Sequence, residues 1–239
     1  GRRRKNLKAA MTCVCQVSRS SPLRQNKALP PGEVVPKNKT TRLAKLARPK
    51  LHDVLARERL FTLLDAGRER ALVWVAGPPG AGKTALVASY LDARKLGGIW
   101  YHLDASDHDP ATFFHYLSQT IELAEGQAPL PVISPEHLAA LPAFTRYYFR
   151  EFYARLRTPA VLVFDNYHEI PATSLLHGAI EQAAQEAPEG TSLIVISRED
   201  SPPEFSRLDA LDRLARIEWN DLKLTLEEGT AIVALRFDL

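Results

Sequence analysis

The sequence predicts an α/β domain in which helices cover both faces of a five-stranded parallel sheet. Three observations support this prediction. Continuous apolar runs of strand length recur along the chain, segments with helical spacing of apolar residues separate them, and the first run leads directly into a glycine-rich loop. A strand buried on both faces is apolar throughout, so the alternation of such runs with helices is typical of a parallel sheet.

The first half of this domain has clear start and stop signals. Leu60, Leu63 and Leu64 are spaced for one helix face, and Gly67 ends that helix. Asp109 with Pro110 reads as a helix cap followed by a first helical residue. The expected elements of this half are a helix at 60–67, a strand at 71–76, a helix at 83–95, a strand at 99–103 and a helix at 110–123.

The second half continues the alternation after a loop at 125–134 that bears Pro and Gly. Pro135 starts a helical turn, and Pro142 starts a helix with an aromatic stripe that we interpret as core packing. The remaining expected elements are a strand at 160–164, a helix at 175–186, a strand at 192–196, a short helix at 204–213, a strand at 216–219 and a last helix from 225.

The composition is that of a globular domain with a basic N-terminal segment. The 239 residues are 45% hydrophobic and 25% charged, and a chain of this length can bury a core of ordinary size. Residues 1–50 carry 14 Lys and Arg against one acid, whereas the other residues carry 17 against 27. We therefore expect residues 1–47 to be a basic, mostly disordered leader, either simply solvated or in electrostatic contact with nucleic acid.

Cysteine use and hydropathy indicate a cytoplasmic protein. The two cysteines, Cys13 and Cys15, are too close together for a structural disulfide, which favours a reducing compartment. No apolar run approaches the roughly 18 residues of a membrane helix, so we expect no membrane contact. Because the first residue is Gly1 rather than Met, we expect either sequence upstream of a natural start or a fragment.

The glycine-rich loop has the pattern of a Walker A phosphate-binding loop, two glycines five residues apart followed by lysine and a hydroxyl residue. Glycines let successive N–H groups point at phosphate oxygens, and the following helix adds the positive end of its dipole. Lys83 is expected to contact the β- and γ-phosphates, and Thr84 to contact Mg²⁺. The expected nucleotide-binding residues of the loop are Gly77, Pro78, Pro79, Gly80, Ala81, Gly82, Lys83, Thr84 and Ala85.

Two more polar residues follow predicted strands, at the sheet edge where parallel sheets bind ligands. Asp165 ends the strand at 160–164 and is expected to hold Mg²⁺ together with Thr84, because Mg²⁺ prefers oxygen ligands. Arg198 follows the strand at 192–196, where a guanidinium is expected to reach the γ-phosphate. The predicted fold is therefore a P-loop NTPase, and the predicted catalytic residues are Lys83, Asp165 and Arg198.

The residue after Asp165 argues against fast hydrolysis. Many P-loop ATPases place a second acid there, but this chain has Asn166, whose amide can orient water and cannot accept its proton. Glu169 is near in sequence only. We therefore expect ATP hydrolysis to be slow or absent. No Asn-Lys-x-Asp run is present to read guanine, which favours ATP, and the histidines lack the spacing of a metal centre.

The region from about Arg48 to Glu228 resembles the nucleotide-binding domain of MalT-like transcriptional regulators. These are signal transduction ATPases with numerous domains (STAND), related to large ATP-binding regulators of the LuxR type and to bacterial-transcriptional-activator-domain regulators. Beside the phosphate loop, the resemblance rests on Arg48-Pro49-Lys50-Leu51, Trp100-Tyr101-His102-Leu103-Asp104, Asp107-His108-Asp109-Pro110 with Phe113, Asp165-Asn166-Tyr167-His168, Ser197-Arg198 with Ser201-Pro202-Pro203, and Leu222-Leu224-Thr225 with Glu227-Glu228.

The resemblance implies an ATP-binding domain at 48–224, with Arg48 and Pro49 near the adenine, and the truncated start of a following helical module at 225–239. In such regulators ATP holds a form competent to self-associate and ADP a resting form, while separate domains sense the inducer and bind DNA. We therefore expect this chain to bind nucleotide, to self-associate within a longer protein, and to contact DNA only through domains absent here.

Three functions remain open at this point. The first is an ATP/ADP-binding switch domain of a bacterial transcriptional regulator. The second is a working ATPase, a motor or loader that acts on nucleic acid. The third is an inactive fragment that binds nucleotide without consequence.

Overall fold

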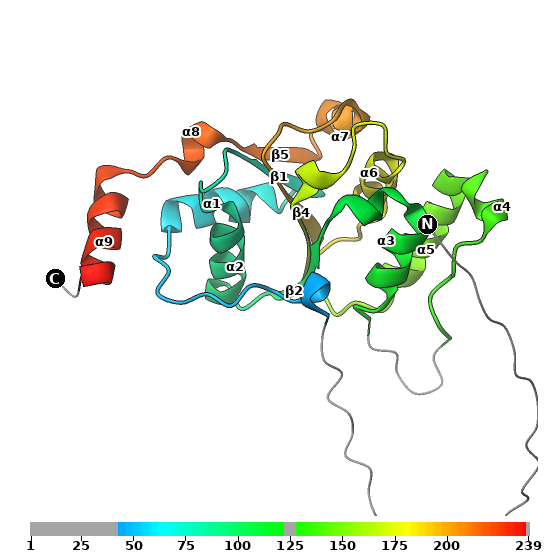
Figure 1. The fold of residues 1–239 in the computed structure, drawn as a ribbon, viewed down its shortest axis with the longest axis horizontal. Helices are drawn as coiled ribbons and strands as arrows, with labels where there is room; N and C mark the ends of the chain where they lie inside the picture. Colours follow the sequence, from blue (N-terminus) through cyan, green and yellow to red (C-terminus); the bar gives the residue numbers. More distant parts are fainter. Residues whose placement is uncertain (1–42, 122–127, 238–239) are drawn as a thin grey trace, which may run out of the picture. The chain divides into compact units, whose positions relative to one another are not determined.

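The computed structural model describes residues 43–121 and 128–237, which contain a sheet of five parallel strands in the order β2-β3-β4-β1-β5 (Figure 1). The strands are β1 Leu72–Ala76, β2 Gly97–His102, β3 Ala160–Asp165, β4 Thr191–Ser197 and β5 Leu214–Ile217. The predicted five-stranded parallel sheet flanked by helices is therefore confirmed. Of the predicted leader, residues 1–42 lie outside the described residues, so the predicted domain limits stay predictions.

Helices connect the strands in nearly the predicted order. The α-helices are α1 Glu58–Gly67, α2 Lys83–Ala93, α3 Pro110–Ser118, α4 Pro135–Leu138, α5 Leu141–Tyr153, α6 Leu176–Glu186, α7 Ser206–Ala210, α8 Trp219–Leu222 and α9 Leu226–Phe237. Four short 3-10 helices complete the described part: η1 Ala44–Leu46, η2 Ala105–His108, η3 Tyr167–Glu169 and η4 Pro203–Phe205.

Several predicted element bounds differ from the structure: the helix predicted at 110–123 ends at Ser118, the strand predicted at 99–103 begins at Gly97 and ends at His102, and the helix predicted at 204–213 ends at Ala210. Two other differences have a local reason. The last strand begins two residues before the predicted 216 and ends at Ile217, because Glu218 and Asp221 form a capping box that starts α8 at Trp219. In α1 the buried residues are Leu60, Phe61 and Leu64, whereas the side chain of Leu63 is exposed. Spacing alone could not choose between Phe61 and Leu63, since both lie within one turn of the other two.

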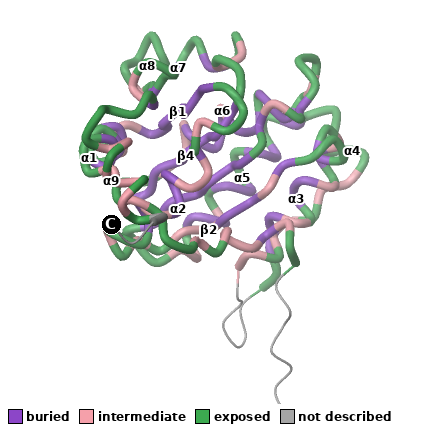
Figure 2. Tube along the Cα trace, turned by 60° about the vertical axis from the view of Figure 1, so that its left-hand side comes forward, coloured by how far each residue is buried: buried purple, intermediate pink, exposed green. Residues whose placement is uncertain are grey.

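The two faces of the sheet pack against different sets of helices. Helices α1 and α2 bury Leu60, Leu86 and Tyr90 against one face, and α3, α5 and α6 cover the other. Figure 2 shows the buried residues concentrated in the strands. The predicted aromatic stripe on α5 lies in the core between the sheet and α3, α5 and α6, where Phe144, Tyr148 and Phe152 are buried. The sheet is thus covered on both faces, and its carboxyl edge is the part from which loops project.

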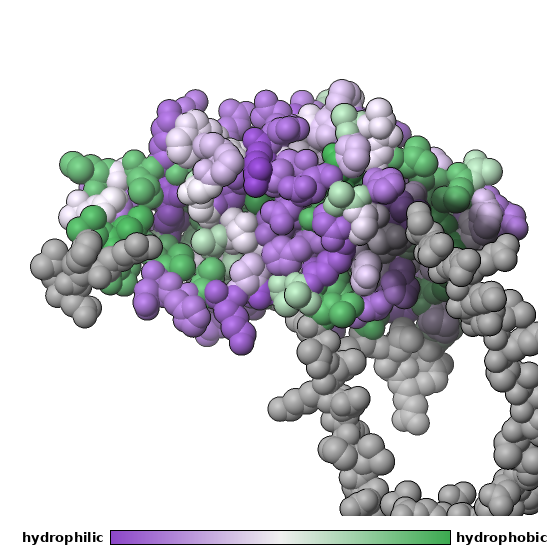
Figure 3. Space-filling view, in the orientation of Figure 1, coloured by the Kyte–Doolittle hydropathy of each residue, from purple (hydrophilic) through white to green (hydrophobic). Residues whose placement is uncertain are grey.

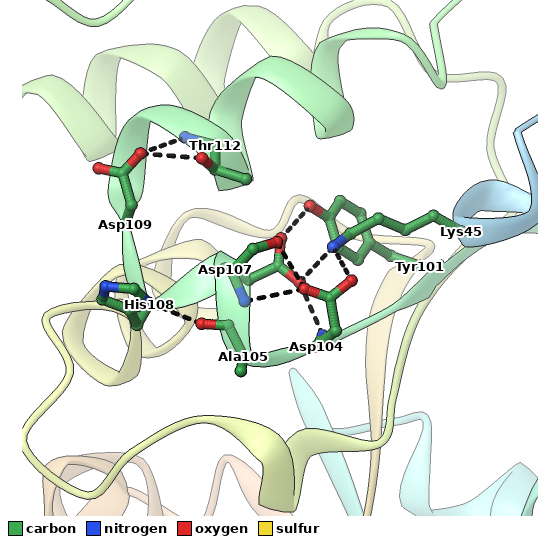
Figure 4. Close-up of polar contacts among 9 residues, drawn as sticks. Lys45, Tyr101, Asp104, Ala105, Asp107, His108, Asp109 and Thr112 are labelled. Atoms are coloured by element: carbon green, nitrogen blue, oxygen red, sulfur yellow. Dashed lines mark hydrogen bonds and ion pairs between the residues drawn. The ribbon is translucent and has the colours of Figure 1, made fainter. Parts of the chain in front are cut away.

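Lys45 joins the segment before α1 to the end of β2 (Figure 4). Its Nζ lies 2.6 Å from Asp104 Oδ2 and 2.7 Å from Asp107 Oδ2. Asp107 is fully buried and also accepts a hydrogen bond of 2.7 Å from the Tyr101 hydroxyl. A buried carboxylate is stable only when paired and hydrogen-bonded, so this cluster fixes η1 against the sheet.

Exposed apolar residues gather at α9 and the segment before it (Figure 3). The exposed fractions are 54% for Leu224, 88% for Leu226, 50% for Val233 and 47% for Leu235, which is more than a helix packed inside a core would leave in contact with solvent. Among the described residues, no helix combines the length and the apolar character that crossing a membrane requires.

The contacts of Lys45 with Asp104 predict how the Asp104 carboxyl group titrates. Burial by itself raises the pKa of the Asp104 carboxyl, but hydrogen bonds from Lys45 and Ser106 bring that pKa down to about 2. The folded pKa thus lies below the unfolded value of about 3.9, so the stability that Asp104 contributes is full above about pH 5 and is lost as the pH falls from about 4 to about 2. In Lys45→Met, carbon NMR of the Asp104 carboxyl should show its pKa rising toward the ordinary value.

Asp109 is the internal control for this titration. Its carboxylate accepts hydrogen bonds from the backbone and hydroxyl of Thr112 and has no contact with Lys45 (Figure 4). The pKa of Asp109 should therefore stay unchanged in Lys45→Met. An unchanged Asp104 pKa in that variant would contradict the assignment of the pairing.

Candidate nucleotide-binding site

The phosphate loop joins β1 to α2 at the carboxyl edge of the sheet, between β4 and the edge strand β5. Gly80 and Gly82 both have φ of +78°, in the left-handed region that side chains disfavour, and Gly82 precedes the first helical residue, Lys83. Lys83 Nζ donates hydrogen bonds of 2.6 Å to Gly77 O and 3.0 Å to Pro78 O. Two of the three ammonium donors thus fix the side chain under the loop, and the third is available for another acceptor.

Lys83 is 8% exposed, and its environment affects its charge. Burial and the neighbouring Arg198 guanidinium lower the pKa of Lys83, whereas Asp165 opposes them. The arrangement therefore puts two cations close to one carboxylate, and bringing a phosphate among them would relieve the repulsion between the cations.

Thr84 and Asp165 meet as predicted for a metal site. Thr84 Oγ1 donates a hydrogen bond of 3.2 Å to Asp165 Oδ1, which also accepts one of 2.9 Å from the backbone N–H of Asn166. Asp165 is only 2% exposed. One hydroxyl and one carboxylate, both hard oxygen donors beside a phosphate loop, fit Mg²⁺, which keeps several waters and takes its remaining ligands from substrate phosphates.

A cavity of about 180 Å³ unites the predicted catalytic residues. Arg198 reaches it from the end of β4, and His168 lines it from the 3-10 helix after β3. Burial, then the Arg198 charge, lower the pKa of His168. The lining residues are Pro79, Gly80, Lys83, Thr84, Asp165, Asn166, His168, Ile196, Ser197 and Arg198.

A second, larger cavity of about 450 Å³ lies on the other side of the loop, mostly apolar in its lining. The segment before α1 provides one wall, and α8, α9 and the residues between them provide another. Its lining residues are Asp53, Val54, Leu55, Arg57, Gly80, Ala81, Gly82, Ala85, Leu86, Trp219, Leu222, Leu224, Ile232 and Leu235. An apolar cavity next to a phosphate loop has the character of a base-binding site.

Most predicted site residues come together, and two lie apart from the cavities. The loop residues, Asp165 and Arg198 line one or both cavities, or a neighbouring groove between the start of the loop and α8. Arg48, in contrast, donates to Ala88 O and pairs at 2.7 Å with Asp92 on α2. Neither it nor Pro49 lines the second cavity, so their place near the adenine stays a prediction.

Several cavity residues were not singled out from the sequence. Arg57 lies 165 positions before Leu222 in the chain, and both line the second cavity, where Arg57 donates a hydrogen bond of 3.0 Å to Leu222 O. A lone arginine before a helix carries no signal of such a role. His168 could have been noted, because it follows Asp165 by three residues on the same loop.

Backbone conformation predicts opposite effects of alanine on stability at a loop glycine, Gly82, and a helical glycine, Gly178. In Gly82→Ala the new Cβ meets no atom within 4 Å, so the left-handed φ is the cost, and we expect a loss of about 1–2 kcal/mol in the free energy of unfolding. Gly178, exposed in α6, also has open space, and Gly178→Ala should instead stabilise by about 0.5–1 kcal/mol. Urea unfolding of both variants measures the difference; equal effects would contradict the left-handed conformation.

Comparison with known proteins finds relatives by sequence. No family model matches the chain. It is 33% identical over 190 residues to the HTH-type transcriptional regulator MalT of Serratia proteamaculans, a match that covers 78% of this chain and 21% of that protein. The MalT of Vibrio cholerae is 32% identical over 194 residues, with the same coverage. The chain thus spans about a fifth of the length of these relatives.

Solved structures with a similar arrangement have lower identity. One is a STAND protein with a tetratricopeptide repeat sensor from Pyrococcus horikoshii, with a TM-score of 0.44 and 14% identity over 80% of this chain and 26% of that one. Another is the ORC1 protein of Aeropyrum pernix in complex with DNA, with a TM-score of 0.46 and 16% identity over 78% and 50%. By these sequence matches, the chain is homologous over 78% of its length to a part of the MalT transcriptional regulators.

Proposed function

We propose that this domain is the ATP/ADP-binding switch of a bacterial transcriptional regulator and that it binds the nucleotide together with Mg²⁺. The observation that carries the proposal is the meeting of Lys83, Thr84 and Asp165 at a loop with two left-handed glycines. A structural turn would need the glycines, but it would not need a buried lysine, nor a buried carboxylate 81 residues beyond Thr84 in contact with the Thr84 hydroxyl.

The phosphates are assigned to the smaller cavity. The loop N–H groups and the α2 N-terminus supply partial positive charge, and Lys83 supplies a full one. Thr84 and Asp165 are the residues that would hold Mg²⁺, which supplies charge neutralisation to the β- and γ-phosphates when bound. Arg198 is exposed and, among the described residues, forms no ion pair, so its guanidinium is available for a γ-phosphate.

The adenosine is assigned to the larger, mostly apolar cavity. Trp219 and Leu222 on α8 face residues of the phosphate loop there, and Arg57 contributes a charged edge. Because α9 supplies Ile232 and Leu235 to the same cavity, a bound nucleoside would contact both the sheet domain and the last helix. This shared wall is the physical basis on which nucleotide state and the position of α9 can be linked.

Slow or absent hydrolysis is the part of the proposal that separates a switch from a motor. Asn166 cannot act as a base, and its side chain is exposed. The rest of the proposal concerns the whole regulator: self-association in the ATP state and DNA contact through other domains. These extend from the homologous regulators, of which the chain spans a fifth.

Removal of the Lys83 charge tests nucleotide binding. Hydrogen bonds to charged groups are worth about 1.5–3 kcal/mol, so Lys83→Met should weaken Mg²⁺-ADP and Mg²⁺-ATP binding at least about tenfold in calorimetry. Lys95→Met is the matched control, since Lys95 is exposed just beyond the other end of α2 and should bind like wild type. Wild-type binding by Lys83→Met would overturn the proposal, and steady turnover typical of a motor would overturn the switch.

Arg198 tests whether the site distinguishes the two nucleotides. If its guanidinium contacts the γ-phosphate, Arg198→Ala should weaken ATP binding about 10- to 100-fold and change ADP binding less than about twofold. Arg207→Ala, which removes an exposed cation from α7, is the control and should affect neither. Equal losses for ATP and ADP would contradict a γ-phosphate contact.

A further inference from the structure

The connection between α8 and α9 is held by an arginine from the start of α1. Arg57 precedes α1, and its Nη2 donates hydrogen bonds of 3.0 Å to Leu222 O and 3.1 Å to Lys223 O. The same nitrogen lies 2.8 Å from Glu228 Oε2, in the first turn of α9. Because Nη2 carries only two N–H groups, these are shared among the three acceptors. One guanidinium nitrogen therefore ties the end of α8 to the start of α9.

Both charges of this ion pair are largely removed from solvent. The side chain of Arg57 is 10% exposed and that of Glu228 is 13% exposed. Glu228 Oε2 also accepts a hydrogen bond of 3.0 Å from the Thr225 N–H, and the Glu228 N–H donates one of 3.1 Å to the Thr225 hydroxyl. This reciprocal pair is a capping box, which fixes the carboxylate at the start of its own helix. Solvent and salt screen such a pair less than one on the surface.

Glu228 provides the ion pairs that tie α9 to the rest of the described chain. In the part of α9 whose side chains the structure describes, ion pairs with other elements are those of Glu228 with Arg57 and, at 3.5 Å, with Arg59. Apolar packing holds the helix only in part, since Leu226 and Val233 are exposed (Figure 3). The position of α9 therefore depends strongly on this one carboxylate.

The same arginine also lines the larger cavity. To that cavity α8 contributes Leu222, and α9 contributes Ile232 and Leu235. Leu222 packs closely on the phosphate loop, because a Cβ added at Gly77 would lie only 2.9 Å from Leu222 Cδ1. The ion pair is thus placed where the loop, α8 and α9 enclose one space, and its loss would let α9 withdraw its two apolar side chains from that space.

We propose that Arg57 is a positioning residue for nucleoside binding: through its ion pair with Glu228 it holds α9 as a wall of the larger cavity. This inference rests on the proposed function, which assigns the adenosine to that cavity and the phosphates to the smaller one. The smaller cavity is lined neither by Arg57 nor by any described residue of α9. The ion pair should therefore govern affinity for the nucleoside part of the ligand and leave affinity for the phosphates alone unchanged.

The test compares ADP with inorganic pyrophosphate, which has two phosphates and lacks the nucleoside. Both affinities are measured by calorimetry with Mg²⁺ for wild type, Arg57→Met and Glu228→Gln. If α9 stays in place in about one molecule in ten without the ion pair, the apparent affinity of Arg57→Met for ADP falls about tenfold. Glu228→Gln, which keeps an uncharged acceptor, should lose about threefold. Affinity for pyrophosphate should change less than about twofold in both variants.

The substitutions keep the local packing and the helix cap. Methionine retains an apolar side chain in place of the arginine stem, and glutamine retains an acceptor for the Thr225 N–H. Glu227→Gln is the matched control, because Glu227 is the exposed neighbour of Glu228 in the same helical turn. Both affinities of this control should equal those of wild type. If Arg57→Met does not fold, Glu228→Gln and its control still decide the question.

A double variant separates action through Glu228 from direct contact with the nucleoside. If Arg57 acts through Glu228, the combination of Arg57→Met with Glu228→Gln binds ADP no more weakly than Arg57→Met alone. Losses that multiply would mean that Arg57 contacts the nucleoside independently of Glu228, and would overturn the positioning role.

Hydrogen exchange of the α9 amides gives a readout other than affinity. If a bound nucleoside and a docked α9 stabilise each other, ADP should slow this exchange in wild type, and pyrophosphate should not. The slowing by ADP should be smaller in Glu228→Gln. Equal slowing by ADP and pyrophosphate would overturn the link between the nucleoside and α9.

The outcomes keep the two proposals apart. Wild type that binds neither ADP nor pyrophosphate overturns the proposed function and with it the role of Arg57. Wild type that binds ADP more tightly than pyrophosphate, with variants that lose neither affinity or lose both equally, overturns only the role of Arg57.

Discussion

The Asp165 carboxylate is the constraint on which the site depends, because a charge this deeply buried must be stabilised by its neighbours. The side chain is 3% exposed, and its contacts come from three segments: Thr84 on α2, Asn166 at the end of its own strand and His102 at the end of β2. Only a parallel sheet brings the ends of β1, β2 and β3 to one edge. The parallel arrangement of the strands is therefore what brings the residues of the site together.

The same edge separates two environments that a nucleotide needs. On one side of the phosphate loop are Lys83 and Arg198, whose charges lower the pKa values of groups near them. On the other side, α8 and α9 enclose an apolar cavity. Gly80 lines both cavities, and the left-handed conformations of Gly80 and Gly82 let the loop turn between them.

The sequence was sufficient for those features that depend on neighbouring residues. The strands β1, β3 and β4 contain continuous apolar runs, the phosphate loop is a contiguous pattern, Asp165 ends β3 and Arg198 directly follows β4, so these features were found from local order. The contact of His102 with Asp165 was not predicted, although His102 ends a strand, because the contact requires β2 to lie beside β3. Strand order is decided by packing of whole elements and is not written in any short stretch.

The second cavity shows the same limit more strongly. Its walls come from residues 53–57 and 219–235, and no local pattern relates segments so far apart. The choice between Leu63 and Phe61 in α1 failed for a smaller reason. Two apolar residues within one helical turn satisfy the same spacing, and the fit of the side chains against the sheet decides which one is buried.

Asn166 also has a structural reason to stand where many ATPases have an acid. Its φ is +62°, a left-handed conformation that asparagine tolerates better than most residues, and this turns its N–H back to Asp165 Oδ1. Its backbone N–H thus donates to the Asp165 carboxylate while its side chain is exposed. Glu169, an acid three residues later, lies with Oε1 3.4 Å from His168 Nε2 and does not line the smaller cavity. Residues that hold the Asp165 carboxylate are therefore in place, whereas neither Asn166 nor Glu169 presents a carboxylate to the smaller cavity. This division favours a domain that responds to which nucleotide it holds over one that consumes it quickly.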